Sequence, residues 1–187
     1  MERQQLLAII KPRMPEKRYI HTLGVMEMAI HLANLYGEDA KKAEIAAILH
    51  DMSKFEDEEA MRQIVRENGL DERLIPWGAE ILHGPIAAWR AQDELGIEDE
   101  DILNAMRYHT TGRAGMSRLE KIVFVADMLE PNRKFDGVEK LRKKAEVDLT
   151  KAMRACIRHS LAFLVDTKQP IYPQSIQCYN DYMREEL

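Results

Sequence analysis

The sequence predicts an all-α protein that folds as a compact, single-domain helical bundle. Apolar residues recur at helical spacing along nearly the whole chain, whereas the alternating pattern of strands is almost absent. The 187 residues suit one domain with a sizeable core. Because no internal repeat, low-complexity tract or long linker divides the chain, we expect one domain over residues 1–187.

Glycines, prolines and one capping pattern set the expected helix limits. Glycines 37, 69 and 96 stand where C-terminal caps belong. Ser117 and Glu120 form a capping box before an apolar run. Gly84-Pro85, Pro131 and the Pro170/Pro173 pair are expected to end helices. In chain order, helices are expected near residues 2–10, 16–36, 39–52, 57–68, 71–82, 85–95, 99–110, 117–130, 138–144, 148–167 and 174–186.

The net charge, the N-terminal sequence and the cysteines indicate the cellular compartment and exclude some binding partners. The net charge of −5 argues against binding to DNA or to an acidic membrane surface. The first residues, "MERQQLLAIIKPRMP", are charged from the start and contain only a short apolar run, which predicts neither a signal peptide nor a membrane span. Cys156 and Cys178 form no disulfide framework or metal-binding pair. We therefore expect a cytoplasmic protein with two buried thiols.

Helical phase separates the six histidines by the direction in which they point. His21 falls on the apolar face of its helix, whereas His31 falls on the polar edge. Helical phase also predicts that His50, His109 and His159 point inward. His83 is the last residue of the apolar segment "WGAEILH". A lone inward histidine is usually a hydrogen-bonded core residue. A functional interpretation therefore depends on whether several of them converge.

Two aspartates are also expected in apolar surroundings, so their function likewise depends on whether they converge with the inward histidines. Asp127 lies in "IVFVADML", which is apolar on every side, and Asp51 directly follows His50. A buried carboxylate without a partner is protonated or strongly destabilising. If these groups converge, one metal ion satisfies all of them, and neutral imidazole with carboxylate suits Fe, Mn, Zn or Co. Phase alone does not establish this convergence.

The order of these residues resembles the H…HD…D signature of the HD-domain metal-dependent phosphohydrolase superfamily, here His21, His50-Asp51 and Asp127. A closer resemblance is to the YqeK-like branch, the symmetrical bis(5'-nucleosyl)-tetraphosphatases. It rests on "RYIHTLGVMEMAIHLA", "AAILHDMSK", "HGPIAAW", "YHTTG" and "MSRLEKIVFVADMLEPNR". The resemblance implies an HD core over about 15–135 with the C-terminal helices of 138–187 packed on it.

The resemblance also implies a reaction and a set of ligands. The substrate is a purine nucleotide, diadenosine tetraphosphate, and attack by a metal-bound hydroxide on the central linkage yields two ADP. The implied metal is iron, held by His21, His50, Asp51 and Asp127. Two roles are open for His83 and His109: they bind a second, weaker metal that Asp51 bridges, or they contact substrate phosphates. We expect the catalytic residues to be Asp51, Lys54, His83 and His109.

Further residues are expected to contact the substrate around the metal. Lys54 lies one turn after Asp51, and Arg133 follows the helix of Asp127, so both can reach a phosphate. Hydroxyl groups of Thr110 and Thr111 follow His109. The expected substrate contacts are His21, Lys54, His83, His109, Thr110, Asp127 and Arg133, with Ile171 and Tyr172 in a proline-bounded loop for the base.

Each of these contacts also has a purely structural explanation. Lys54 could be a solvated lysine at a helix end, Arg133 a surface arginine, and the loop of Ile171 a stiff connector. Two functional alternatives remain at this point: a phosphatase or phosphodiesterase of other purine nucleotides, and a nucleotide-sensing module with little turnover. The sequence does not distinguish a monomer from a homodimer, and it indicates no protein partner.

Overall fold

The computed structural model describes residues 1–184, and this part of the chain forms helices and no strands, which confirms the predicted all-α class. The ten α-helices are α1 (Arg3–Ile10), α2 (Glu16–Tyr36), α3 (Ala40–Leu49), α4 (Glu58–Glu67), α5 (Ala79–Leu95), α6 (Glu100–Arg107), α7 (Arg118–Leu129), α8 (Val138–Ala145), α9 (Leu149–Asp166) and α10 (Pro173–Arg184). Two short 3₁₀ turns are η1 (Lys11–Arg13) and η2 (Glu72–Leu74).

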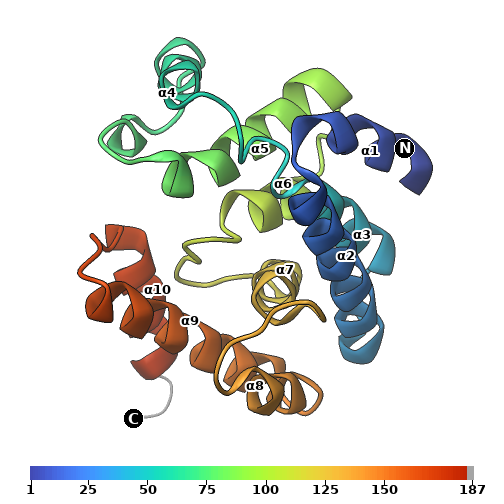
Figure 1. Ribbon diagram of the computed structural model, residues 1–187, viewed down its shortest axis with the longest axis vertical. Coiled ribbons are helices and arrows are strands. Elements are labelled where there is room, and N and C mark those ends of the chain that lie inside the picture. The colour runs from blue at the N-terminus through green and yellow to red at the C-terminus, as the bar shows by residue number, and fades with distance from the viewer. Residues whose placement is uncertain (185–187) are drawn as a thin grey trace.

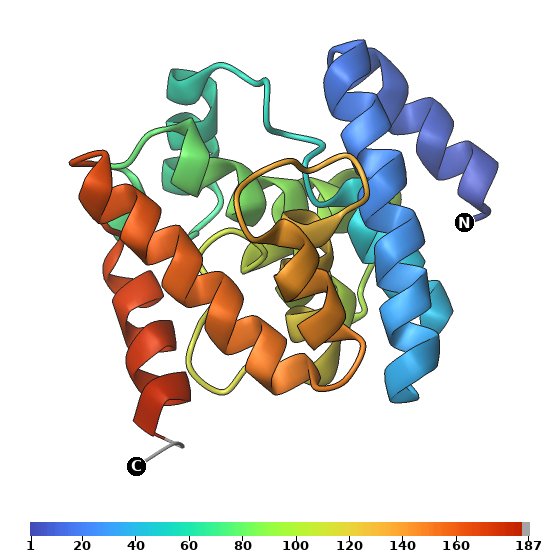
Figure 2. The ribbon, with the colours of Figure 1, turned by 60° about the horizontal axis from the view of Figure 1, so that its bottom comes forward.

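Helix α7 lies at the centre of the bundle (Figure 1). It packs against α2, α3, α6 and α9, so almost its entire surface is covered. This position explains why its sequence is apolar on every side, since a helix covered all round has no solvent-facing stripe. Helices α9 and α10 lie side by side and cover one flank of the bundle (Figure 2).

The apolar interior has two parts. The large cluster fills the space between α1, α2, α3, α6, α7 and α9, and the second half of α5, α8 and α10 also contribute residues to it. A small cluster lies between α4, η2 and the first half of α5, and it consists of Met61, Val65, Leu74, Leu82, Ile86 and Tyr172. Tyr172 reaches this cluster from the loop between α9 and α10, so the end of the chain is tied to α4 and α5.

Several predicted helix ends agree with the structure. Gly37 and Gly96 adopt left-handed backbone conformations directly after α2 and α5, with φ of 65° and 64°. Ser117 caps α7 by accepting a hydrogen bond from the backbone N–H of Glu120 at 3.2 Å. The reciprocal half of the predicted capping box is absent, because the buried Glu120 carboxylate accepts two hydrogen bonds from Arg113 instead.

Four predicted boundaries are wrong. One is the end of the helix expected over 99–110, because α6 ends at Arg107 and His109 lies in the turn that follows. Gly84-Pro85 does not end a helix, because α5 runs through both residues and packs against α6. The expected helix over 71–82 is reduced to η2, and α5 begins after Gly78. Helix α3 ends at Leu49, so His50 and Asp51 lie in the turn that follows it. The last residues of the helix expected over 174–186 lie outside the described part of the chain.

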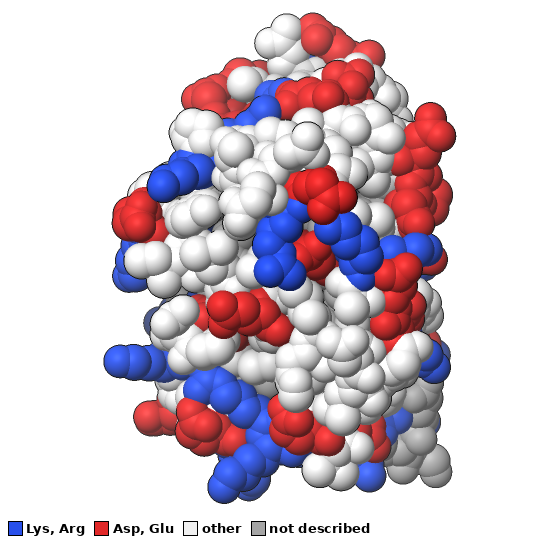
Figure 3. Space-filling view, turned by 90° about the vertical axis from the view of Figure 1, so that its right-hand side faces the viewer, with Lys and Arg blue, Asp and Glu red and all other residues white. Residues whose placement is uncertain are grey.

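Surface charge, helix length and the two cysteines each relate to an expectation from the sequence. The face shown in Figure 3, on the side of α1 and α2, carries basic and acidic side chains next to one another rather than a basic patch. Among the described residues, no helix is long and apolar enough to cross a membrane. Cys156 and Cys178 are both buried and form no disulfide.

Replacing Gly84 with alanine tests the close approach of α5 to α6. A Cβ atom there would lie 3.0 Å from the carbonyl oxygen of Arg107 and 3.2 Å from that of Met106. Backbone atoms cannot move aside as a flexible side chain can, so Gly84→Ala is expected to lower the free energy of unfolding by about 1–3 kcal/mol. This direction is opposite to the usual gain from replacing glycine within a helix.

Urea denaturation measures this effect. The control is Gln92→Ala, at an exposed position of the same helix, which is expected to change the free energy of unfolding by less than about 0.5 kcal/mol. A Gly84→Ala protein as stable as the wild type would show that α5 and α6 are less closely packed than described.

Candidate metal centre

Four histidines from separate elements converge in the interior. His21 comes from α2, His50 from the turn after α3, His83 from α5 and His109 from the turn after α6, and all four are buried. The ring centroids of His50 and His109 are 4.8 Å apart, and those of His83 and His109 are 4.9 Å apart. His21 lies 5.8 Å from His50. The inward direction expected for His21, His50 and His109 agrees with the structure.

The Asp51 carboxylate lies between two pairs of these histidines. Its Oδ2 atom is 3.1 Å from Nε2 of His50 and 3.8 Å from Nε2 of His21. Its Oδ1 atom is 3.2 Å from Nε2 of His83 and 3.8 Å from Nε2 of His109. Each carboxylate oxygen therefore faces one pair, and the two resulting groups both have the composition of a metal site.

Asp127 adds a second carboxylate to the pair formed by His21 and His50. Its Oδ1 atom is 2.9 Å from Nε2 of His21 and 3.9 Å from Nε2 of His50. The side chain is 21% exposed, so it lies at the opening of the cluster rather than in the fully apolar surroundings that its sequence context indicated. Arg133 donates a hydrogen bond to the same oxygen at 3.1 Å.

The other ring nitrogen of every histidine in the cluster has an acceptor. Nδ1 of His50 donates to the carbonyl of Ala47 at 2.6 Å. The Nδ1 atoms of His83 and His109 likewise donate to main-chain carbonyls, at 2.8 and 2.7 Å. Nδ1 of His21 faces the carboxylate of Glu130 at 3.1 Å. Because a carbonyl oxygen can only accept, Nδ1 of His50, His83 and His109 carries a proton, and the neutral form of each of these rings presents an Nε2 lone pair to the centre.

The arrangement of the Nε2 atoms fits a cation. Within residues 1–184, the Nε2 atoms of His21 and His50 are buried and have no hydrogen-bond partner, although carboxylate oxygens lie close to both. The Nε2 atoms of His83 and His109 face one another at 3.0 Å. Lone pairs held this close repel unless a positive charge satisfies them. Neutral imidazoles with carboxylates are the ligands that Fe, Mn, Zn and Co ions accept.

The pKa values of the two aspartates and of His109 agree with this interpretation. Burial lowers the pKa of His50, but Asp51 and Asp127 raise it above its usual value, so a cation that binds there competes with a proton. Burial alone would raise the pKa of Asp51, but His50 and His83 bring it well below its usual value. His21, His50 and Arg133 likewise lower the pKa of Asp127 against the effect of burial. Burial, together with the neighbouring His50 and His83, lowers the pKa of His109 to about 3. Both aspartates are therefore ionised and His109 is neutral near pH 7, which are the protonation states of metal ligands.

Basic residues surround the opening of the cluster. Arg18, one helical turn before His21, donates to Oδ2 of Asp51 at 2.9 Å. Lys54 is paired with Glu80 at 2.5 Å, and the Glu80 side chain is 80% exposed. Arg133 lies next to Asp127 as described above. The structure thus places Arg133 against Asp127, and it pairs Lys54 with Glu80, which lies one turn before His83 on α5.

Not all of the residues expected at the site lie there. The Thr110 hydroxyl is 3.0 Å from Nε2 of His109, but the Thr111 side chain is buried and donates to the carbonyl of Gly112. Tyr172 packs edge-on against Trp77, with ring centroids 5.0 Å apart, in the small apolar cluster. His159, the further inward histidine, stacks on Phe135 instead of joining the other four.

Sequence reasoning missed two residues of this site, Arg18 and Glu130. Both could have been found from their spacing, because Arg18 precedes His21 by three positions and Glu130 follows Asp127 by three. Each therefore lies one turn from a residue already singled out. Their charges looked like ordinary helix-surface charges because their partners come from distant parts of the chain.

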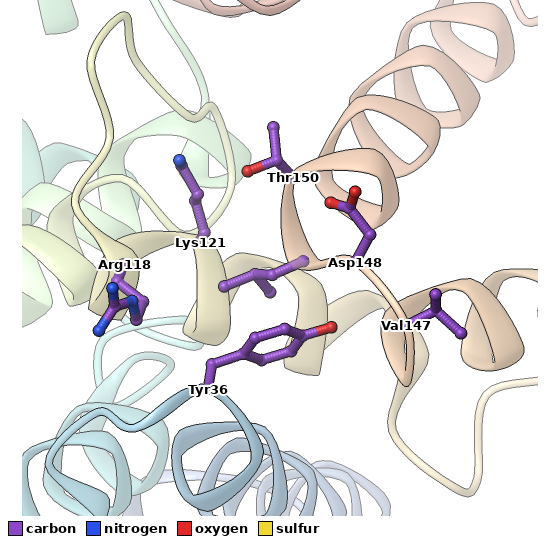
Figure 4. A pocket seen from close by; sticks show the side chains of 7 residues that line it. Tyr36, Arg118, Lys121, Val147, Asp148 and Thr150 are labelled. Atoms are coloured by element: carbon purple, nitrogen blue, oxygen red, sulfur yellow. The ribbon is translucent and has the colours of Figure 1, made fainter.

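A separate pocket of about 350 Å³ lies between the end of α2, the start of α7 and the α8–α9 turn (Figure 4). The residues that line it are Tyr36, Arg118, Lys121, Val147, Asp148, Leu149 and Thr150. None of the histidines of the cluster is among them. The carboxylate of Asp148 already caps the start of α9 there, and Arg118 donates to the carbonyl of Gly37.

A family model, curated relatives and a crystal structure all relate this chain to HD-domain proteins or symmetrical bis(5'-nucleosyl)-tetraphosphatases. The model of the HD domain family matches residues 18–132. Proteins named symmetrical bis(5'-nucleosyl)-tetraphosphatase are 49% identical in Halalkalibacterium halodurans, over all of both chains, and 48% identical in Bacillus subtilis, over 96% of this chain and 97% of the relative. A crystal structure from Clostridium acetobutylicum, described as a predicted HD superfamily hydrolase involved in NAD metabolism, superposes with a TM-score of 0.93. It is 37% identical and covers 99% of this chain and 98% of its own.

Replacing Asp127 tests the metal centre directly. Asp127→Ala removes a carboxylate that faces two of the unpartnered Nε2 atoms, so the affinity for a divalent cation is expected to fall at least tenfold. The measurement is the metal content of the purified protein, followed by titration of the metal-free protein with Co²⁺. Asp166→Ala, at an exposed position of α9, is the matched control and should keep the wild-type affinity. Full metal content in Asp127→Ala would remove this residue from the ligand set.

Proposed function

This chain belongs to the HD domain family, and we propose that it is a divalent-cation-dependent hydrolase that cleaves diadenosine tetraphosphate symmetrically into two ADP. The observation that carries the proposal is the convergence of four histidine Nε2 atoms on the carboxylates of Asp51 and Asp127. The names of relatives that match over nearly their full length support the substrate.

In this proposal the residues of the centre hold two cations of unequal affinity. His21, His50, Asp51 and Asp127 form the tight site, and His83 and His109 form a weaker one that shares Asp51. A bound divalent cation supplies positive charge to a phosphoryl oxygen and lowers the pKa of water in contact with it. We propose iron as the resident metal, which the residue types accept.

The residues around the opening are proposed to bind the phosphates. The two aspartates would repel a polyphosphate, but Arg18 and Arg133 are each paired with one of them and reduce that repulsion. Arg133 is 39% exposed and offers a planar group for bidentate contact. Lys54 can exchange its exposed partner Glu80 for a phosphate, because surface ion pairs contribute little to stability.

The proposed phosphate contacts also position the scissile bond. The hydroxyl of the half-buried Thr110 lies 3.0 Å from Nε2 of His109 and 3.4 Å from Nε2 of His83, where it can donate to a phosphate oxygen. Divalent cations held by the histidines and aspartates, together with Arg133 and Lys54, would stabilise the charge that develops on the non-bridging and leaving oxygens. His83, His109, Asp51 and Lys54 are therefore our proposed catalytic residues, which act by holding and orienting the reacting groups.

Fewer observations support the proposed contact with the nucleotide base. Ile171 is half-buried and offers apolar surface in a loop bounded by prolines. Tyr172, its neighbour, is 8% exposed and held against Trp77, so it fixes the loop more than it exposes a ring face. We also place the protein in the cytoplasm, which its two free, buried cysteines support.

Product analysis tests the proposed reaction. The purified protein, loaded anaerobically with Fe²⁺, is incubated with diadenosine tetraphosphate and, separately, with ADP, ATP and deoxynucleotides. Two ADP per substrate molecule is the expected outcome. ATP with AMP would contradict cleavage at the central linkage, and faster turnover of the mononucleotides would favour a general nucleotide phosphatase. Nucleotide binding without turnover of any of them would favour a sensing module.

A double variant tests the weaker cation site. His83→Ala with His109→Ala removes both histidines that face Oδ1 of Asp51, so the metal stoichiometry at saturating Co²⁺ is expected to fall from two to one per chain. His31→Ala is the control, since its ring is exposed and paired with Glu146. An unchanged stoichiometry would leave His83 and His109 with a role toward the substrate alone.

A further inference from the structure

We propose that Glu130 is a positioning residue that determines which nitrogen of His21 carries the proton. This inference rests on the cation site proposed above. Glu130 directly follows α7 and is 2% exposed, and its Oε1 atom is 3.1 Å from Nδ1 of His21. A carboxylate oxygen accepts from an N–H, so this contact favours a proton on Nδ1 of His21. Nε2 faces Oδ1 of Asp127 at 2.9 Å, and with the proton of the neutral ring on Nδ1 it is available to a cation held there.

His21 differs from the other three histidines in this respect. Main-chain carbonyls within four residues orient His50, His83 and His109, so the local helix or turn alone sets their tautomers. The partner of His21 instead comes from 109 residues further along the chain. It is also charged, and a charged acceptor makes the opposite ring nitrogen more basic and a stronger metal ligand.

The second oxygen of Glu130 makes the role specific to a carboxylate. Its Oε2 atom accepts a hydrogen bond from the backbone N–H of Asn132 at 2.6 Å. Two donors therefore point at the two oxygens, one from the main chain and one from His21. A carboxylate satisfies both donors. A glutamine offers only one oxygen, and its NH₂ group would then face the second donor.

The surrounding chain is built to hold this carboxylate in place. Gly24, one turn after His21 on α2, leaves the space that it occupies, because a Cβ atom there would lie 2.5 Å from Oε2. Arg142 of α8 donates to the carbonyls of Leu129 and Glu130 at 2.8 and 2.6 Å. Contacts with α2 and with α8 therefore hold the start of the loop after α7. Arg142 lies beyond the residues 18–132 that match the family model.

Glu130→Gln tests the inference with almost no change of shape. The backbone N–H of Asn132 cannot change its role, so it takes the glutamine oxygen and the NH₂ group faces Nδ1 of His21. The proton of His21 is then expected to move to Nε2, and the affinity for Co²⁺ is expected to fall about 10- to 100-fold. The tautomer is measured by ¹⁵N NMR of the histidine rings in the metal-free protein, and the affinity by Co²⁺ titration.

Glu120→Gln is the matched control. Glu120 is also a buried glutamate of α7 with two donors, here both from Arg113, but it lies ten residues earlier, about 15 Å along the helix. It should change neither the tautomer nor the affinity. A second variant, Gly24→Ala, displaces the carboxylate with Glu130 unchanged and should weaken Co²⁺ binding in the same direction.

The outcomes separate this inference from the proposed function. A shift of the His21 proton together with weaker Co²⁺ binding supports it, and rescue of affinity in Glu130→Asp would strengthen it. Retention of the Nδ1 proton and of wild-type affinity in Glu130→Gln would overturn it. If the wild-type protein bound no cation, the proposed function would fail, whereas the tautomer measurement in metal-free protein would still decide the role of Glu130.

Discussion

The structure depends on the burial of one carboxylate, that of Asp51. Its side chain is 2% exposed, and leaving water without compensation would cost several kcal/mol. Arg18 compensates part of this cost by donating to Oδ2, and a cation held by the histidines whose Nε2 atoms face both oxygens would compensate the rest. These partners come from α2, α5 and the turn after α3, so the charge of one residue requires several helices to meet at one point.

The helices can converge on this point because small residues lie where the helices approach one another. Ala46 and Ala47 are fully buried at the end of α3, next to His50. Gly84 lets α5 approach the main chain of α6 near His109, and Gly24 admits the Glu130 carboxylate against α2. Larger side chains at these places would fill the interior well but would separate the ligands. The core is therefore shaped by the centre as much as by apolar burial.

Much of the fold was predictable because helical periodicity and capping are local properties of the sequence. The limits of α2, α8 and α9 differ from expectation by no more than one residue, and Pro131 follows α7 closely as predicted. The break at Gly84-Pro85 was wrong because tertiary packing overrides a local preference. Likewise, phase identified His21, His50 and His109 as inward, but it also included His159, which stacks on Phe135. Arg18 and Glu130 lie one turn from His21 and Asp127, but this spacing does not reveal the distant partners, Asp51 and His21, on which their roles depend.

The division of the apolar interior links the centre to the stability of one edge of the molecule. Helix α5 contributes Leu82 and Ile86 to the small cluster, and Ala87, Ala88 and Ala91 to the large one, with His83 beside the boundary. Regions with few buried apolar contacts open at lower free-energy cost than the rest of a protein. Local opening of the small cluster would therefore loosen α5 and withdraw His83, while His21 and His50 stay anchored in the large cluster. One half of the centre is thus more susceptible to thermal fluctuation than the other, although both share the Asp51 carboxylate.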